Sequence, residues 1–136
     1  MVSHLPFKWS VRIYFEDTDS GGVVYHSNYL KFMERARTEW LRSLDLNQVD
    51  LRKKDKIMFV VANVNIDYKK AARFNDELDI ETSINKIGAS RVDLTQNIMK
   101  NSELYTSAKV SIACIHSETF KPQRIPKLIK QQMEIL

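Results

Sequence analysis

Alternation of apolar and polar residues through the second half of the chain constrains the fold more than any other feature of the sequence. Four stretches repeat with a period of two and are predicted to be strands with one face against a core, namely residues 60–68, 78–85, 92–98 and 104–116. Gly88-Ala89-Ser90 and Asn101-Ser102 separate consecutive strands as short turns, which is typical of an antiparallel sheet. A fifth strand is predicted over residues 9–15.

One long helix is predicted between the first strand and the others, over residues 28–44. Its apolar residues recur three or four positions apart and form one face, made of Leu30, Met33, Ala36, Trp40 and Leu44. Ser27 or Asn28 can cap its start, because each has a side-chain oxygen for the free amides of the first turn. Arg35 and Glu39 lie four positions apart and are predicted to pair on its surface.

The order of these elements predicts an α+β fold in a single domain, residues 1–136, with the helix packed on one face of the sheet. A chain of 136 residues can enclose a hydrophobic core without disulfides or metal. Residues 47–56 are polar and are predicted to hold a short helical turn. Pro122 and Pro126 interrupt the chain before a short terminal helix that is predicted to end at Leu136.

The sequence carries few signs of a special compartment. Its single cysteine, Cys114, cannot form an internal disulfide. Residues 1–15 lack the apolar run and cleavage site of a signal peptide, and no stretch approaches the length that crosses a bilayer. We therefore expect a cytoplasmic protein without stable membrane insertion. The net charge of +4 mildly favours an anionic partner, which includes nucleic acid, an acidic lipid surface and a phosphorylated small molecule.

The loop between the first strand and the helix carries the residues best suited to chemistry, Glu16-Asp17-Thr18-Asp19-Ser20-Gly21-Gly22. A carboxylate can act as a nucleophile or as a general base toward water. Glycines let the backbone approach a ligand closely. The following helix N-terminus offers unpaired amides, which stabilise negative charge on a carbonyl oxygen under attack. A carboxylate with such donors makes a workable acyl-transfer site.

The residues alone leave other interpretations open. Asp-x-Asp followed by Gly-Gly is most often a solvated turn, and the loop carboxylates are also possible cation ligands. His26 can act through its side chain or only through its backbone amide. His4 and His116 have no ligand spacing with it, so no metal site is predicted and both are expected to be structural. Cys114 alternates with apolar neighbours and is predicted to lie in the core.

One continuous run, from Val11 to Leu44, is specific enough to indicate a family, VRIYFEDTDSGGVVYHSNYLKFMERARTEWLRSL. It resembles the opening of the hotdog-fold acyl-CoA thioesterases of the 4-hydroxybenzoyl-CoA thioesterase superfamily, and is closest to their Tol-Pal-associated, YbgC-like subgroup. Ser20 stands where alanine is common in relatives. Later pieces agree in the same order, so that the resemblance covers nearly the whole chain: FVV at residues 59–61, IDYKKAARFND at 66–76 and KPQRIPK at 121–127.

The resemblance implies a hotdog fold, in which a five-stranded antiparallel sheet wraps a long central helix, and homodimers or homotetramers. It also implies hydrolysis of an acyl-CoA to free acid and coenzyme A, without a cofactor. Asp19 would be the catalytic carboxylate, as nucleophile or general base, and the backbone amide of His26 would polarise the thioester carbonyl. The substrate-binding residues of the same motif would be Gly21, Gly22, Val24 and Tyr25.

Basic residues outside the motif are candidates for binding the phosphates of coenzyme A. Lys86 and Arg91 are predicted to bind substrate, and Lys69, Lys70 and Arg73 belong to the same basic set. Arginine suits a phosphate better than lysine, because its donors are bidentate. The competing interpretation is an ordinary solvated surface, since charged residues on strands and turns usually face water.

Other function classes stay open at this point. A non-catalytic scaffold of the same fold could bind acyl carrier protein through a basic face, and such a protein would release no thiol from an acyl-CoA. A hydratase of this fold would carry a different motif with Asp and His. Nucleic-acid binding is disfavoured, because no basic stripe interleaved with aromatic residues is present.

Overall fold

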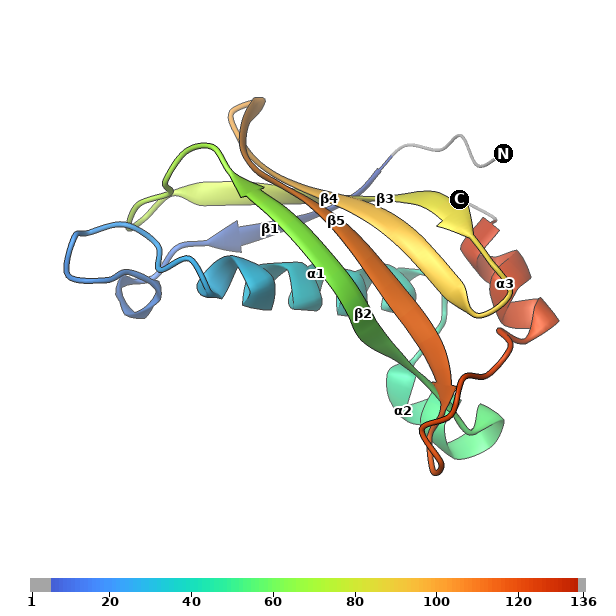
Figure 1. Ribbon diagram of the computed structural model, residues 1–136. Helices are drawn as coiled ribbons and strands as arrows, with labels where there is room; N and C mark the ends of the chain where they lie inside the picture. Colours follow the sequence, from blue (N-terminus) through green and yellow to red (C-terminus); the bar gives the residue numbers. More distant parts are fainter. Residues whose placement is uncertain (1–5, 135–136) are drawn as a thin grey trace.

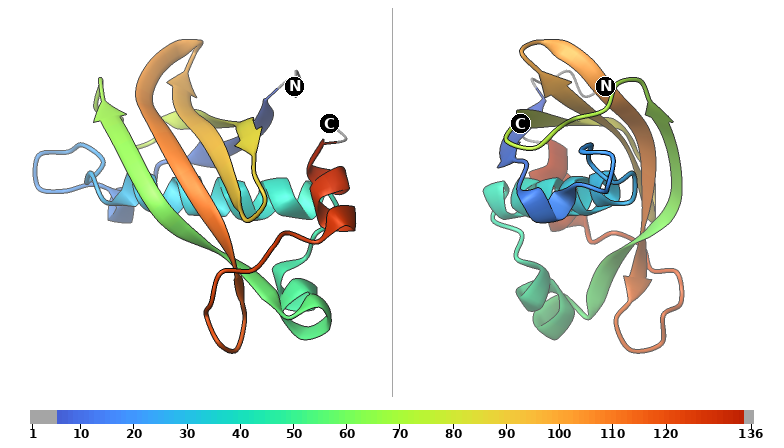
Figure 2. Two further views of the ribbon diagram at one scale, coloured as in Figure 1. Left: turned by 45° about the vertical axis from the view of Figure 1, so that its right-hand side comes forward. Right: turned by 90° about the vertical axis from the view of Figure 1, so that its left-hand side faces the viewer.

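The computed structural model describes residues 6–134, in which a five-stranded antiparallel sheet curves around one long helix (Figures 1 and 2). The helix is α1 (Asn28–Ser43), and the strands are β1 (Phe7–Arg12), β2 (Ile57–Tyr68), β3 (Glu77–Ile87), β4 (Arg91–Lys100) and β5 (Glu103–His116). Their order across the sheet is β1-β3-β4-β5-β2, so β1 and β2 are its edges. The α+β class and the antiparallel pairing predicted from alternation are confirmed.

The hairpin between β4 and β5 shows how the predicted turns work. Asn101 and Ser102 both have positive φ, 49° and 66°. Left-handed backbone at both central residues matches the right-handed twist of the flanking strands. Beyond this turn, Lys100 pairs with Glu103 and the register holds, apart from a bulge near Ile98, up to Arg91 opposite Ala113.

Four short elements complete the described chain, η1 (Phe15–Asp17), α2 (Gln48–Asp50), η2 (Leu51–Asp55) and α3 (Lys127–Glu134). The helical turn predicted at 47–56 is present, and the Asn47 carboxamide oxygen caps it by accepting from the amides of Val49 (2.8 Å) and Asp50 (3.3 Å). Leu136, the predicted end of the last helix, lies outside the described residues. No helix within residues 6–134 combines the length and apolar character needed to cross a bilayer.

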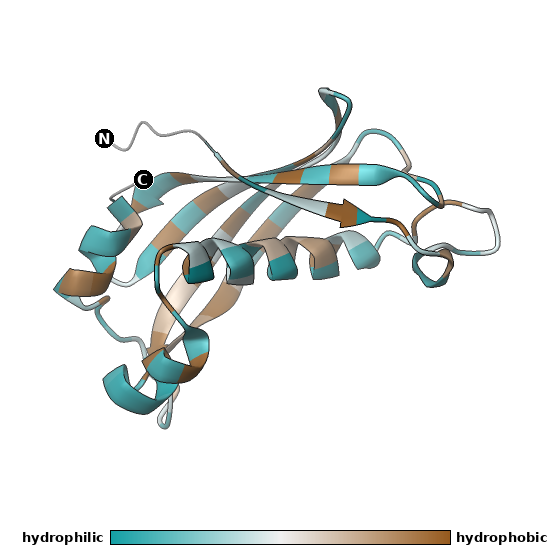
Figure 3. Ribbon diagram, turned by 180° about the vertical axis from the view of Figure 1, so that it is seen from behind, coloured by the Kyte–Doolittle hydropathy of each residue, from teal (hydrophilic) through white to brown (hydrophobic). Residues whose placement is uncertain are grey.

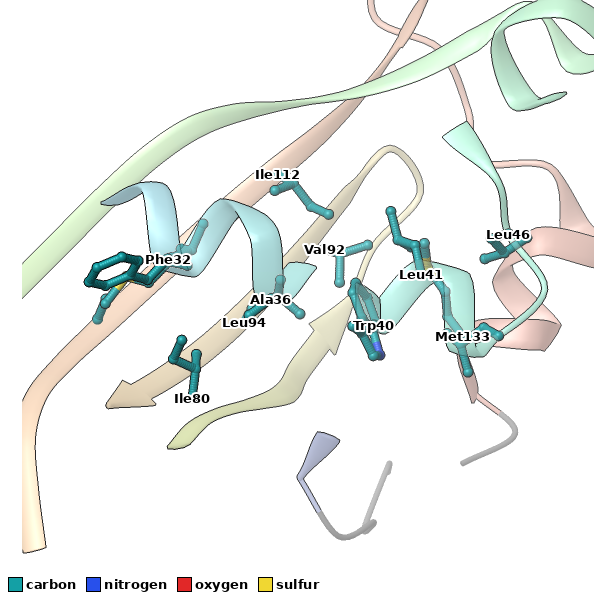
Figure 4. Close-up of a cluster of buried hydrophobic side chains, with 14 of the residues drawn as sticks. Phe32, Ala36, Trp40, Leu41, Leu46, Ile80, Val92, Leu94, Ile112 and Met133 are labelled. Atoms are coloured by element: carbon teal, nitrogen blue, oxygen red, sulfur yellow. The ribbon is translucent and has the colours of Figure 1, made fainter. Parts of the chain in front are cut away.

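The core lies between α1 and the concave face of the sheet (Figure 4). Alternating residues of β3, β4 and β5 point into it, and the same alternation of residue types is visible along the strands in Figure 3. The buried residues of α1 follow a helical stripe, Tyr29, Phe32, Met33, Ala36, Trp40 and Leu41. The prediction for Leu30 was wrong, because that stripe passes through Tyr29 and leaves Leu30 42% exposed.

One fully buried polar residue, Gln96 on β4, ties α1 to the sheet. Its Nε2 donates to the carbonyl oxygen of Met33 (3.1 Å) and to the hydroxyl of Thr82 (3.0 Å), and its Oε1 accepts from Arg37 (2.8 Å). Burial would penalise an unpaired amide, but here both ends of the side chain are hydrogen-bonded. These three hydrogen bonds attach α1 to the middle strands of the sheet.

Two sequence predictions are corrected by these elements. The first strand ends at Arg12 and not at residue 15, because residues 15–17 form the η1 turn. Glu39 forms its ion pair with Arg42 (2.7 Å) rather than with Arg35. Both partners of the Glu39 pair are substantially exposed, so the pair contributes little to the free energy of unfolding.

Candidate active site

The Asp17 carboxylate organises the start of the loop that connects β1 to α1. Its Oδ2 accepts from the amide of Tyr14 (2.8 Å), which closes η1. The Asp17 carbonyl oxygen then accepts from the amide of Tyr25 (3.1 Å) and from the carboxamide of Asn28 (2.8 Å). Asp17 therefore joins the two ends of the loop and has a structural part in it.

Asp19 occupies the turn that Asp17 supports. Its Oδ1 accepts from the amide of Gly21 (2.8 Å), its amide donates to Val23 (2.9 Å), and its carbonyl accepts from Gly22 (3.0 Å). A Cβ at position 21 would lie 3.2 Å from the Asp19 Oδ1, and Gly22 has a φ of 80°. The two glycines are therefore required by a close approach and by left-handed backbone, respectively. The Asp19 side chain is exposed.

Helix α1 begins a few residues after this turn. Within residues 6–134, the amides of His26 and Ser27 donate no backbone hydrogen bond, so they remain available. Neither predicted cap is formed, because the Ser27 side chain makes no capping bond and the Asn28 side chain donates to Asp17 instead. The first turn carries no acidic residue, so the positive end of the helix dipole is not neutralised locally.

The segment after β2 holds the loop in place. The amide of Val24 donates to the carbonyl of Ala72 (2.8 Å), and Val23 pairs with Arg73 as an isolated bridge. The amide of Ala72 in turn donates to the hydroxyl of Tyr29 (3.1 Å), which is buried in α1. Burial raises the pKa of the Tyr29 phenol.

Aromatic residues surround the start of α1. The hydroxyl of Tyr68, at the end of β2, donates to the carbonyl oxygen of His26 (3.3 Å). The His26 ring lies 4.5 Å from the Tyr25 ring and 6.3 Å from the Tyr68 ring, measured between centroids. Sequence reasoning assigned no role to Tyr29, Tyr68 or Ala72. The only signal for the last two was that they belong to the run 66–76 that resembles the family.

The structure separates the predicted site residues into two groups. One end of the sheet brings together the loop residues and the helix start, namely Asp19, Gly21, Gly22, Val24, Tyr25 and His26. Lys86 and Arg91 lie at the opposite end of the sheet, at the turn between β3 and β4, where they line a surface pocket of about 270 Å³. In Figure 1 the blue loop and that turn are at opposite sides of the molecule.

The basic residues nearer to the loop are partly neutralised. Lys70 forms an ion pair with Glu103, and Lys100 forms one with Asp76 (3.1 Å). Burial alone would raise the pKa of the Asp76 carboxyl, but hydrogen bonds from the Arg73 amide and from Lys100 hold it below its usual value. These pairs reduce the charge that the Lys70 side of the sheet can offer to a phosphate.

The remaining candidates fall outside the site. His116 Nδ1 accepts from the amides of Glu118 (3.1 Å) and Thr119 (3.3 Å), which confirms a structural part for this residue. His4 lies outside the described residues. Cys114 is fully buried, as predicted, and burial raises the pKa of its thiol to about 11. Within residues 6–134, no three His, Cys, Asp or Glu side chains gather as metal ligands would.

Comparison with known proteins shows which family the chain belongs to. The family model described as the thioesterase-like superfamily matches residues 13–133. The chain is 42% identical to the acyl-CoA thioesterase YbgC of Haemophilus influenzae over 91% of both chains, and 40% identical to the acyl-CoA thioester hydrolase YbgC of Escherichia coli O6:H1 over 90% of this chain and 92% of that one. A probable thioesterase from Bartonella henselae superposes with a TM-score of 0.83 at 37% identity, covering 88% and 98% of the two chains.

The fold is the hotdog fold, and the chain belongs to the thioesterase-like superfamily. Within that superfamily its similarity to proteins named YbgC extends over nearly its whole length. The thioesterase family and the likeness to YbgC proteins predicted from the run Val11–Leu44 are thereby confirmed, and the Tol-Pal association stays a prediction.

Proposed function

We propose that this protein hydrolyses the thioester bond of an acyl-CoA to a free acid and coenzyme A. The observation that carries the proposal is the combination at one loop of an exposed carboxylate, Asp19, with a helix start at which the amides of His26 and Ser27 donate to no backbone acceptor in residues 6–134. The relatives named acyl-CoA thioesterases are 40–42% identical across nine-tenths of the chain, which supports the same reaction here.

In this mechanism the amide of His26 donates a hydrogen bond to the thioester carbonyl oxygen and stabilises the charge that develops on it. Asp19 then acts in one of two ways. As a nucleophile it bonds to the carbonyl carbon, the C–S bond breaks, and water hydrolyses the resulting anhydride. As a general base it takes a proton from water, whose oxygen attacks the carbon directly. Both routes release the coenzyme A thiol and one carboxylic acid.

Gly21, Gly22, Val24 and Tyr25 are proposed to contact the substrate, because they form the turn and the strand-like segment between Asp19 and His26. Lys86 and Arg91 are also proposed to contact the phosphates of coenzyme A, although they lie far from the Asp19 loop. Since both lie at the far end of the sheet from Asp19, we propose that a second subunit supplies them to a substrate held at Asp19.

A second subunit is part of the proposal. The edge strand β2 has no partner on its outer side within residues 6–134, and it exposes the apolar Val61 (46%). A groove of about 240 Å³ runs beside it, lined by Leu30 and Met33 of α1 and by Val61 and Val64 of β2. Open edges of this kind are normally covered. We therefore propose a homodimer joined through β2, which can pair again into a tetramer.

A panel of acyl-CoAs that varies chain length and aromaticity, with release of free thiol as the readout, tests the function. Hydrolysis of at least one acyl group supports it. The same acyl groups carried on acyl carrier protein determine which carrier is preferred. Binding of acyl carrier protein without thiol release from any substrate would instead favour the non-catalytic scaffold.

A further inference from the structure

A second surface, at the end of the molecule away from the Asp19 loop, concentrates positive charge. There η2 lies against the loop that follows β5, because the amide of Ser117 donates to the carbonyl oxygen of Lys56 (2.9 Å) (Figures 1 and 2). Together, residues 52–56 and 117–121 contain five basic and two acidic side chains, a net charge of +3 in a chain whose total is +4. We call the exposed residues of this surface the basic knuckle, Arg52, Lys53, Lys54, Lys56, Phe120 and Lys121.

Phe120 belongs to the basic knuckle and has an unusual backbone conformation. Its side chain is 65% exposed, and its φ of 62° lies in the left-handed region that bulky residues rarely adopt. Strained backbone of this kind persists only where surrounding bonds enforce it. Here the amide of Phe120 donates to the carbonyl oxygen of His116 (2.9 Å), and the amide of His116 donates to that of Lys121 (2.9 Å).

The fold therefore holds a large apolar ring in water on a firmly bonded loop. Exposed in this way, the ring contributes little to the core, while the left-handed backbone that holds it there costs free energy. The loop protrudes beyond the end of the sheet, as both views in Figure 2 show. An exposed aromatic ring on a protruding loop that lies against a second, cationic segment is the arrangement of a docking surface rather than of a packed interior.

We propose that the basic knuckle adsorbs to an anionic phospholipid surface, with Phe120 entering the interfacial layer and the cations meeting headgroup phosphates. Four of the five basic residues are lysines. Lysine is depleted in protein–protein interfaces, whereas clusters of basic residues beside apolar ones suit a diffuse anionic surface. Recognition of a single carboxylate or phosphate would favour arginine. The attachment is peripheral and reversible.

The test is sedimentation of the full chain with vesicles of phosphatidylcholine, alone or mixed with phosphatidylglycerol. Binding is expected only to the mixed vesicles and should weaken as salt is added. Lys53→Glu/Lys54→Glu and Phe120→Ser should each lower the partition coefficient about tenfold or more. Thermal unfolding of each variant checks that the fold is retained.

Matched controls come from α3, which carries residues of the same types away from the basic knuckle, Lys127 and Leu128 exposed and Lys130 partly exposed. Lys127→Glu/Lys130→Glu changes the net charge equally, and Leu128→Ser removes an apolar side chain that is 73% exposed. Both should bind like the unmodified protein. Equal losses in the controls, absence of binding to the mixed vesicles, or capture by an acidic protein such as acyl carrier protein without vesicle binding would overturn the proposal. Vesicle binding needs no turnover, so its failure leaves the proposed hydrolysis untouched.

Discussion

The hydroxyl of Tyr68 donates a hydrogen bond of 3.3 Å to the carbonyl oxygen of His26, and so joins the edge strand β2 to the residues just before α1. This bond acts on the peptide unit next to the His26 amide, which is proposed to donate to the thioester carbonyl oxygen. Since β2 is also the strand proposed to pair between subunits, Tyr68 connects the proposed interface with the proposed site.

Tyr68→Phe should therefore lower kcat by about two- to tenfold and leave KM nearly unchanged, because one hydrogen bond contributes about 0.5–1.5 kcal/mol. Steady-state kinetics measure both constants. Tyr105→Phe on β5 is the matched control and should keep the original kcat. A rise in KM at constant kcat would show that Tyr68 binds substrate rather than positions the His26 peptide.

Self-association through β2 is the second prediction. Light scattering at micromolar concentration should give at least twice the chain mass of 15.9 kDa. Val61→Lys places a charge in the β2 edge and should shift the protein toward monomer. Val49→Lys alters a residue of α2 that is even more exposed (59%) and should leave the mass unchanged. A monomeric unmodified protein would contradict this part of the account.

The third prediction concerns the phosphates of coenzyme A. Lys86→Ala/Arg91→Ala should raise KM severalfold at low ionic strength, and the difference should shrink in high salt, because exposed charges are screened. Lys109→Ala, on the outer face of β5, is the control. A KM that does not change at any salt concentration would remove Lys86 and Arg91 from the substrate site.

Some parts of this structure could be predicted from the sequence and others could not. Periodicity predicted the strands that cover the core and placed the start of α1 at Asn28, because these depend on local apolar spacing. It placed Leu30 in the core wrongly, since several registers of a helical stripe fit the same pattern. It gave no sign that Gln96 would be buried, because a polar residue among apolar ones is tolerated only where distant partners, Met33 and Thr82, satisfy it.

The candidate site, too, could be predicted from the sequence only in part. Asp19, Gly21 and His26 are adjacent in one motif and were predicted together. The support from Ala72 and Tyr68 crosses more than forty residues of sequence, so no spacing rule within the motif could indicate it. The separation of Lys86 and Arg91 from the loop depends on the strand order, which alternation alone does not determine.

The fourth prediction follows from the buried thiol of Cys114, whose pKa rises from 9.0 to about 11 on folding. The folded state binds the thiol proton more tightly than the unfolded state does. The contribution of this proton to the free energy of unfolding is therefore fully present below pH 9 and is lost as the pH rises toward 11. The loss should be about 2–3 kcal/mol. Urea unfolding at several pH values in this range measures the free energy of unfolding. Cys114→Ala should make that free energy depend less steeply on pH. An equal slope in both proteins would contradict the assignment to Cys114.

The central claim is that the Asp19 carboxylate carries out the chemistry while Asp17 only shapes the loop. Release of free thiol from an acyl-CoA by Asp19→Asn and Asp17→Asn, measured side by side, tests it most directly. Asp19→Asn should lower kcat by at least about a hundredfold with substrate binding retained. Asp17→Asn should be much milder, because asparagine can still accept the bond from the Tyr14 amide. Loss of turnover in Asp17→Asn with activity kept in Asp19→Asn, or unchanged turnover in both, would contradict the account.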